Sequence, residues 1–260
     1  MDLGDILSNY TYVFILIMAR YIGLFLLAPI LGSRVIPVRV RIALIYFLAV
    51  LTLPILSNLQ AIALPINPVI IGLGVISELA VGFTIGFISF LVFAVIQLAG
   101  QFIDMRMGFA IVNVMDPITG MSAPLMGQFK NVLAILLFLT INGHHLLIKT
   151  LYQSYNFIEL GGAAFSHSTF QYIFQTTADI FMLAFQLALP VLGTLFIADV
   201  IFGFLARSIP QMNIFIVGLP MKILIGLLVL ILSIHFTVYF FRDLFSGMYQ
   251  QLYQLIKLLG

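Results

Sequence analysis

Residues 97–120 read Gln97-Leu-Ala-Gly-Gln-Phe-Ile-Asp-Met-Arg-Met-Gly-Phe-Ala-Ile-Val-Asn-Val-Met-Asp-Pro-Ile-Thr-Gly120 and lie between two long apolar parts of the chain. This segment is too polar, and too rich in Gly and Pro, for an ordinary membrane-spanning helix. It is also too apolar for an ordinary solvated loop. Irregular backbone beside a membrane is tolerated only where it is buried in protein or lines a cavity. We therefore expect the segment to lie inside an assembly or a pore, and we expect function there.

The composition indicates an integral membrane protein. Of the 260 residues, 63% are hydrophobic and only 8% are charged, and the mean hydropathy is +1.21. Soluble domains carry about 25% charged residues. The net charge of +2 is too small to indicate an acidic partner, and the absence of a basic cluster argues against nucleic-acid binding.

The apolar residues form about six blocks, each a candidate membrane helix, since about 20 apolar residues span a bilayer. Two blocks are short for this task and the third is too long, so we predict an all-α membrane protein of irregular design. Pro190 should kink or break the fifth block. The blocks are residues 10–29, 40–56, 68–98, 132–148, 174–198 and 214–241.

Ionisable residues inside apolar blocks are costly unless they are paired or hydrated, and they are the default functional candidates. A stand-alone secondary transporter would use the carboxylates among them to couple ion and solute movement. The alternative is that these groups pair with basic residues inside a helical assembly. The residues concerned are Arg20, Glu78, Asp179, Asp199 and Lys222.

No motif for an enzyme, a metal or a cofactor is present. The chain has no Cys, and no hydrolase, metalloprotease, phosphate-loop or dinucleotide fingerprint occurs. His144 and His145 are adjacent, so on a helix their side chains diverge and do not form a metal site by themselves. Gly82 and Gly86 form a GxxxG match, which predicts close helix packing within this chain or with a neighbour.

Several motifs, in order, carry a resemblance to a known family. They are Gln97 to Asp104 leading into Met107-Gly-Phe-Ala110, then Met115-Asp-Pro117, then Leu136-Leu-Phe-Leu-Thr-Ile-Asn-Gly-His-His145, and finally Pro210-Gln-Met-Asn-Ile-Phe215 with Val217-Gly-Leu-Pro-Met-Lys222. Together they resemble the FliR/SctT family of type III secretion export-gate subunits. The resemblance covers essentially the whole chain and is stronger to the flagellar branch.

The resemblance implies the architecture and the partners. A member of this family joins FliP and FliQ in a helical ring that forms the entry pore for exported flagellar polypeptides in the bacterial cytoplasmic membrane. FlhB packs against the cytoplasmic mouth and FlhA lies beneath it. It also implies long helical hairpins, in which not every apolar block truly spans the bilayer. A FliP-like part would lie at about residues 1–175 and a FliQ-like hairpin at about residues 176–260. No cofactor is implied.

The resemblance also implies roles for particular residues. The loop from Met105 to Gly120 would enter the pore as a plug, with Asp104, Arg106 and Asp116 pairing at its base. The predicted gating residues are Met105, Arg106, Met107, Gly108, Phe109, Ile111, Val114, Met115, Asp116 and Pro117. The predicted turn near the cytoplasmic mouth contains Pro210, Gln211, Asn213, Phe215, Pro220 and Lys222.

Three other interpretations remain open. The chain could serve a virulence injectisome as an SctT-like subunit, or act as a stand-alone transporter through Glu78, Asp179 and Asp199. It could also be a scaffold whose loop never gates the pore. The gate hypothesis requires association with sister subunits, whereas a transporter would be active as a monomer or homodimer.

Overall fold

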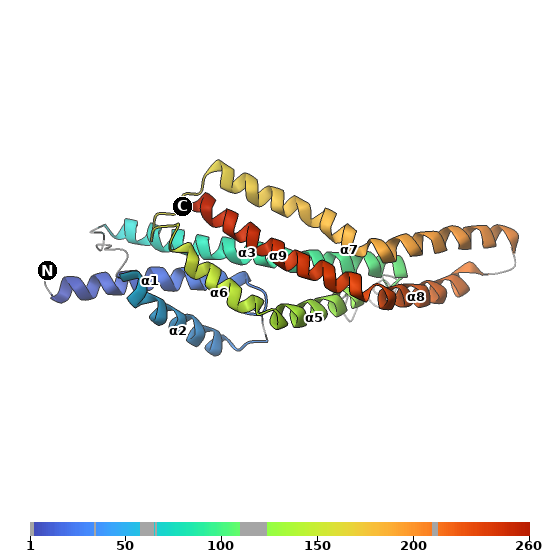
Figure 1. Cartoon of the computed structure of the whole chain (residues 1–260), viewed down its shortest axis with the longest axis horizontal. Coiled ribbons are helices and arrows are strands. Elements are labelled where there is room, and N and C mark those ends of the chain that lie inside the picture. The colour runs from blue at the N-terminus through green and yellow to red at the C-terminus, as the bar shows by residue number, and fades with distance from the viewer. Residues whose placement is uncertain (1–2, 34, 58–64, 66, 110–123, 210–212) are drawn as a thin grey trace. The chain divides into compact units, whose positions relative to one another are not determined.

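The computed structural model describes residues 3–33, 35–57, 65, 67–109, 124–209 and 213–260, and within these ranges every regular element is a helix. The all-α prediction is therefore confirmed. In chain order (Figure 1) the helices are α1 (Leu3–Leu27), α2 (Val38–Ser57), α3 (Pro68–Met107), α5 (Leu125–Thr140), α6 (Gly143–Ser154), α7 (His167–Ser208), α8 (Ile214–Leu232) and α9 (Ile234–Leu259).

The helices reproduce the six predicted blocks, with two of the blocks broken. Among the described residues, four helices are long and apolar enough to cross a membrane, or up to six if each broken pair counts as one span. The fourth block breaks at Asn142, whose backbone is left-handed (φ 56°, ψ 32°), a conformation that Asn adopts more readily than most residues. The sixth block breaks at Ser233, where α8 and α9 meet at a bend of 61°.

Helix α7 is longer than predicted and does not break at Pro190. It has 42 residues, against the predicted block of 174–198, and remains helical through the proline. A proline inside a helix costs about 3 kcal/mol because one hydrogen bond is lost. The neighbouring Leu187, Ala188 and Val191 are fully or almost fully buried, and this packing offsets the loss.

Local sequence explains where two of the long helices begin. Asn67 precedes α3, and its Oδ1 accepts a hydrogen bond from the Val69 N–H at 2.9 Å, while Pro68 occupies the first helical position, where its missing N–H is not needed. Ser166 precedes α7 in the same way, because its Oγ accepts from the Thr169 N–H at 3.4 Å.

The chain divides into two compact units. The first comprises Met1–Leu91, Leu139–Thr177 and Phe245–Gly260, and the second comprises Val92–Phe138 and Ala178–Leu244. Each unit has its own apolar core. Fully buried side chains of the first include Leu16, Ile17, Leu24, Ile85, Leu147, Leu151 and Leu252, and those of the second include Ile96, Ala99, Ile103, Met107, Ala134, Phe138 and Leu195.

In the first unit, glycines allow α1 and α3 to approach closely. A Cβ placed on Gly82 would overlap the carbonyl oxygen of Arg20, and one placed on Gly86 would lie 2.9 Å from the carbonyl oxygen of Leu24. From α1, a Cβ on Gly23 would overlap the carbonyl oxygen of Leu79. The GxxxG pair thus lies against a helix of the same chain. In the same unit α2 packs on α1 (Figure 1), and Tyr21 and Thr52 share a hydrogen bond of 2.9 Å.

Candidate functional site

The C-terminal end of α3, in the second unit, is closed by a glycine. Gly108 has φ +92°, and the Phe109 N–H donates to the carbonyl oxygen of Asp104 at 3.0 Å. This hydrogen bond, which spans a glycine in the left-handed region, defines a Schellman motif. The motif ends α3 at the point where residues 110–123 begin.

The Asp104 carboxylate caps the next helix. The Met126 N–H lies 3.0 and 3.1 Å from its two oxygens, and the Gly127 N–H lies 3.3 Å from one of them. These N–H groups belong to the first turn of α5, where no partner exists within the helix. Pro124, the residue before α5, has no side-chain acceptor, so Asp104 takes the role that Ser, Thr, Asn or Asp usually plays at this position. Asp104 therefore ties the end of α3 to the start of α5.

Two glycines bring these helices into contact. A Cβ on Gly100 of α3 would overlap the Cα of Gly127 of α5, so the two backbones approach as closely as glycine permits. Because Gly127 is also one of the residues that Asp104 caps, close packing and capping act at the same place.

Replacing Asp104 by Ala should destabilise the second unit by about 1–2 kcal/mol, the usual cost of losing a helix cap. Asp104→Asn should cost less, because the amide oxygen still accepts one of the N–H bonds. Thermal unfolding of the purified protein measures the difference. Asp179→Ala serves as control, since Asp179 is exposed; an equal loss from both variants would contradict the capping role.

Helix α8 packs on the same end of α3. Met107 is fully buried, and a Cβ on Gly226 would lie 2.7 Å from its Cε. A Cβ on Gly108 would lie 3.2 Å from Leu219. The end of α3 is thus held by α5 through Asp104 and by α8 through Met107.

Asp199 of α7 interacts with two basic residues. Lys222 of α8 forms a close ion pair with its Oδ1, and Arg106 of α3 lies 3.9 Å from its Oδ2. The three side chains are partly exposed, with Arg106 the most accessible at 56%. The cluster carries one carboxylate and two cations, so it keeps a net positive charge.

The described part of the predicted gating segment lies in this region. Met105 is exposed, Met107 is buried and Arg106 faces Asp199, while Gly108 and Phe109 form the end of α3. Asp104 was predicted to pair at the base of the loop. In the structure its carboxylate instead accepts hydrogen bonds from backbone N–H groups of α5. The remaining predicted residues, Ile111, Val114, Met115, Asp116 and Pro117, lie outside the described residues.

The predicted turn near the cytoplasmic mouth is partly helical. Pro210 and Gln211 lie outside the described residues, and Asn213 accepts the Ile216 N–H at the start of α8. Phe215 belongs to the first turn of α8. Pro220 and Lys222 lie farther along the helix, so these two residues of the predicted turn are helical.

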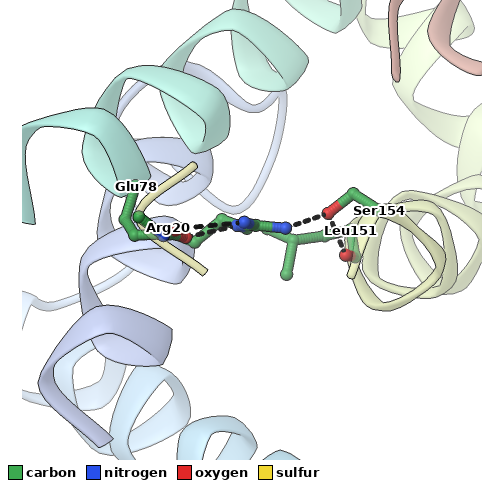
Figure 2. Close-up of polar contacts among 5 residues, drawn as sticks. Arg20, Glu78, Leu151 and Ser154 are labelled. Carbon is green, nitrogen blue, oxygen red and sulfur yellow. Dashed lines mark hydrogen bonds and ion pairs between the residues drawn. The ribbon is translucent and has the colours of Figure 1, made fainter. Parts of the chain in front are cut away.

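A buried ion pair links three segments of the first unit. Arg20 of α1 and Glu78 of α3 are both fully buried, with Nε to Oε2 at 2.5 Å and Nη2 to Oε1 at 2.9 Å. Figure 2 shows Arg20 between Glu78 and Ser154 of α6, whose Oγ accepts from Nη1 at 2.8 Å. Such bidentate pairing is the strongest arrangement for a carboxylate and a guanidinium.

Two further residues complete this cluster. The Gly161 N–H donates to Glu78 Oε1 at 2.8 Å, and the Arg20 guanidinium lies 4.1 Å from the centre of the Tyr155 ring. Burial raises the pKa of Tyr155 well above its usual range, so the phenol stays neutral. Every charged oxygen and nitrogen of the pair thus has a partner, as a buried pair requires.

These contacts distinguish two interpretations of the carboxylates in the apolar blocks, as groups that couple ion and solute movement or as partners in ion pairs. Glu78 is held by Arg20, Asp199 is held by Lys222, and Asp179 is exposed. The pairing interpretation therefore fits Glu78 and Asp199. Ser154 and Gly161 could not be predicted as partners of the pair, because small polar residues and backbone N–H groups carry no distinctive signal in a sequence. Within the described residues no three His, Asp or Glu side chains gather as a metal site.

Comparison with known proteins gives a consistent result. Residues 11–248 match the family model described as bacterial export proteins, family 1. The flagellar biosynthetic protein FliR of Bacillus subtilis (strain 168) is 34% identical over 250 residues, which cover 95% of each chain. FliR of Pectobacterium carotovorum is 31% identical over 264 residues, covering 100% of this chain and 97% of the relative. FliR of Escherichia coli (strain K12) is 29% identical over 238 residues, covering 92% and 90%.

Proposed function

Because this chain belongs to family 1 of the bacterial export proteins, we propose that it is a FliR-type subunit of the flagellar type III protein-export gate. The observation that carries the proposal is the family match over residues 11–248, together with flagellar relatives that align along almost the full chain. The names of these relatives favour the flagellar over the injectisome interpretation.

The chain would form, with FliP and FliQ, the pore through which unfolded flagellar proteins leave the cytoplasm, in the bacterial cytoplasmic membrane. Its apolar surface supports this role. Only 17% of the apolar window of α2, and 33% of that of α7, is buried within the chain. Surface of this kind requires lipid or protein around it. FlhB and FlhA would bind at the cytoplasmic side.

The chain would have the two-part organisation expected of this family, a FliP-like part followed by a FliQ-like hairpin. Residues 1–175 would match FliP, and residues 176–260 would match the helical hairpin of FliQ. The bend between α7 and α8 would be the bend of that hairpin, with Asn213 at the start of α8.

The segment from Met105 to Gly120 would close the resting pore. Its support is the way its two ends are held: the Schellman motif at Gly108 ends α3, and Asp104 caps α5 beyond the segment. Met side chains are flexible and adaptable, so Met and Phe together would seal the pore against water and yield to polypeptides of varied sequence. The fixed ends would keep α3 and α5 in place while the pore opens.

Native mass spectrometry of the detergent-extracted protein, co-expressed with FliP and FliQ, tests the assembly. A stoichiometric hetero-oligomer is expected, with this chain present once. Recovery of homo-oligomers alone would refute the export-gate proposal.

Deleting residues 110–116 should make membranes containing the assembled gate leaky to small ions, while Asp104 and Gly108 keep the helix ends in place. Leak is measured as ion flux across vesicles or as slower growth of cells in high salt. The control is a deletion of equal length, residues 58–64, between α2 and α3. Assembled gates with wild-type leak after the first deletion would favour the scaffold interpretation.

A further inference from the structure

The second unit contains an open apolar groove lined by residues of α3 and α7. Its volume is about 660 Å³, within the roughly 300–1,000 Å³ typical of small-molecule sites. Phe102 and Met105 line it from α3, and Phe185, Leu189 and Phe196 line it from α7. Met105 and these three α7 side chains are exposed. The groove is therefore accessible from outside this unit.

Among the described residues, one charged side chain lines the groove, at the end of α3. Arg106 lies in the last turn of α3, one turn beyond Phe102, and residues four apart share a helix face. Asp199 forms its close ion pair with Lys222, and lies 3.9 Å from Arg106. Lys222 makes the closer ion pair with Asp199, and Arg106, which is 56% exposed, keeps guanidinium N–H groups that can donate to an anion.

The groove and the cation suit a single amphiphilic ligand. Both α3 and α7 are long and apolar enough to cross a membrane. Arg at the end of such a helix extends its charge toward the headgroup layer while its stem stays in apolar surroundings. An apolar channel that ends at a cation matches a molecule with a hydrocarbon chain and an anionic head.

We propose that this groove binds an anionic phospholipid, with one acyl chain between the α3 and α7 side chains and the phosphate at the Arg106 guanidinium. The bound lipid would cover apolar surface that the chain leaves exposed and would neutralise the positive charge of the Arg106–Lys222–Asp199 cluster. The inference rests on contacts within the second unit, but Met105 and Arg106 also begin the segment proposed as the plug. It therefore places these two side chains in the groove beside α7 and leaves closure of the pore to the rest of that segment.

Helix α7 offers a matched pair of variants for the test. A Cβ on Gly193, which lines the groove, would meet no atom within 4 Å, and the same is true of Gly203, which does not line it. Both residues therefore accept a Cβ without a clash, and open space surrounds the point from which a larger side chain would extend. Gly193→Leu should fill the groove, and Gly203→Leu should leave it open.

The experiment counts phospholipids retained by the protein, co-expressed with its sister subunits, in native mass spectrometry after incubation with phosphatidylglycerol or phosphatidylcholine. Each methylene contributes about 0.8 kcal/mol, so excluding two of them should lower phosphatidylglycerol affinity roughly tenfold in Gly193→Leu. Gly203→Leu should match the wild type. Arg106→Gln should reduce the preference for phosphatidylglycerol about fivefold, whereas Arg207→Gln, an exposed cation outside the groove, should not.

Each of the following outcomes would contradict the proposal. Equal phosphatidylglycerol retention by Gly193→Leu and the wild type would mean that the groove holds no lipid. Loss of sister subunits from Gly193→Leu, with lipid unchanged, would mean that a partner helix fills the groove. Equal retention of phosphatidylglycerol and phosphatidylcholine by the wild type would mean that Arg106 does not select an anionic headgroup. The lipid count can be read on this chain alone, so failure of the gate to assemble would not obscure it.

Discussion

Glu78→Gln is expected to lower the free energy of unfolding by about 3–5 kcal/mol, because it leaves the fully buried Arg20 guanidinium without a counter-charge. This loss is a large fraction of the roughly 5–15 kcal/mol that separates folded from unfolded proteins. The amide would still accept one hydrogen bond from Arg20, and Ser154 would still accept another. Neither supplies the negative charge. The first unit should therefore unfold at much lower temperature, or fail to accumulate.

The measurement is thermal unfolding of the purified protein, together with the amount of protein in the membrane. Glu159→Gln removes the same charge from an exposed position and should change stability by less than about 0.5 kcal/mol. The double variant Arg20→Met with Glu78→Leu should recover part of the loss, since apolar replacement of a buried pair is often tolerated. A Glu78→Gln protein as stable as the Glu159→Gln protein would show that the pair contributes nothing to stability.

Gly82→Ala is the second change with a large expected effect, about 3 kcal/mol of destabilisation or more. The new methyl group would overlap the backbone carbonyl of Arg20, and backbone cannot rotate away as a side chain can. Helices α1 and α3 would have to separate, and overpacking of this kind costs 1–3 kcal/mol or more. The separation would also pull Arg20 from Glu78, so the loss should exceed that of an ordinary added methyl group.

Gly72→Ala provides the control on the same helix. A Cβ on Gly72 would meet no atom within 4 Å, so the substitution should stabilise α3 by about 0.5–1 kcal/mol through reduced chain entropy. Thermal unfolding of both variants should therefore show shifts of opposite sign. Destabilisation of similar size in both would indicate that α3 tolerates no alanine, and the close contact with α1 would not be the cause.

The fold class and the main helices could be predicted from the sequence because hydrophobicity alone indicates them. The break at Asn142 was missed because the apolar residues continue across it, and a single left-handed residue leaves no trace in hydropathy. Of the two outcomes expected at Pro190, a kink or a break, the break does not occur. Helix propensity is a local quantity, and the burial of residues around the proline depends on the tertiary structure.

For the candidate site, sequence could indicate which residues matter but not which residues they contact. Arg20 and Glu78 stand out as charges in apolar blocks, yet 58 positions separate them and nothing in either neighbourhood identifies the other. Asp104 was expected to pair with a charge. Its true partners are backbone N–H groups, which every residue except proline carries, so the sequence contains no signal for them.

The Asp104 bridge also determines how freely the intervening segment can change in length. The ends of residues 110–123 are held by Asp104, Gly108 and the first turn of α5, all of which lie outside the segment. Because these contacts lie outside the segment, a change in the number of residues between α3 and α5 should leave the ends of both helices in place.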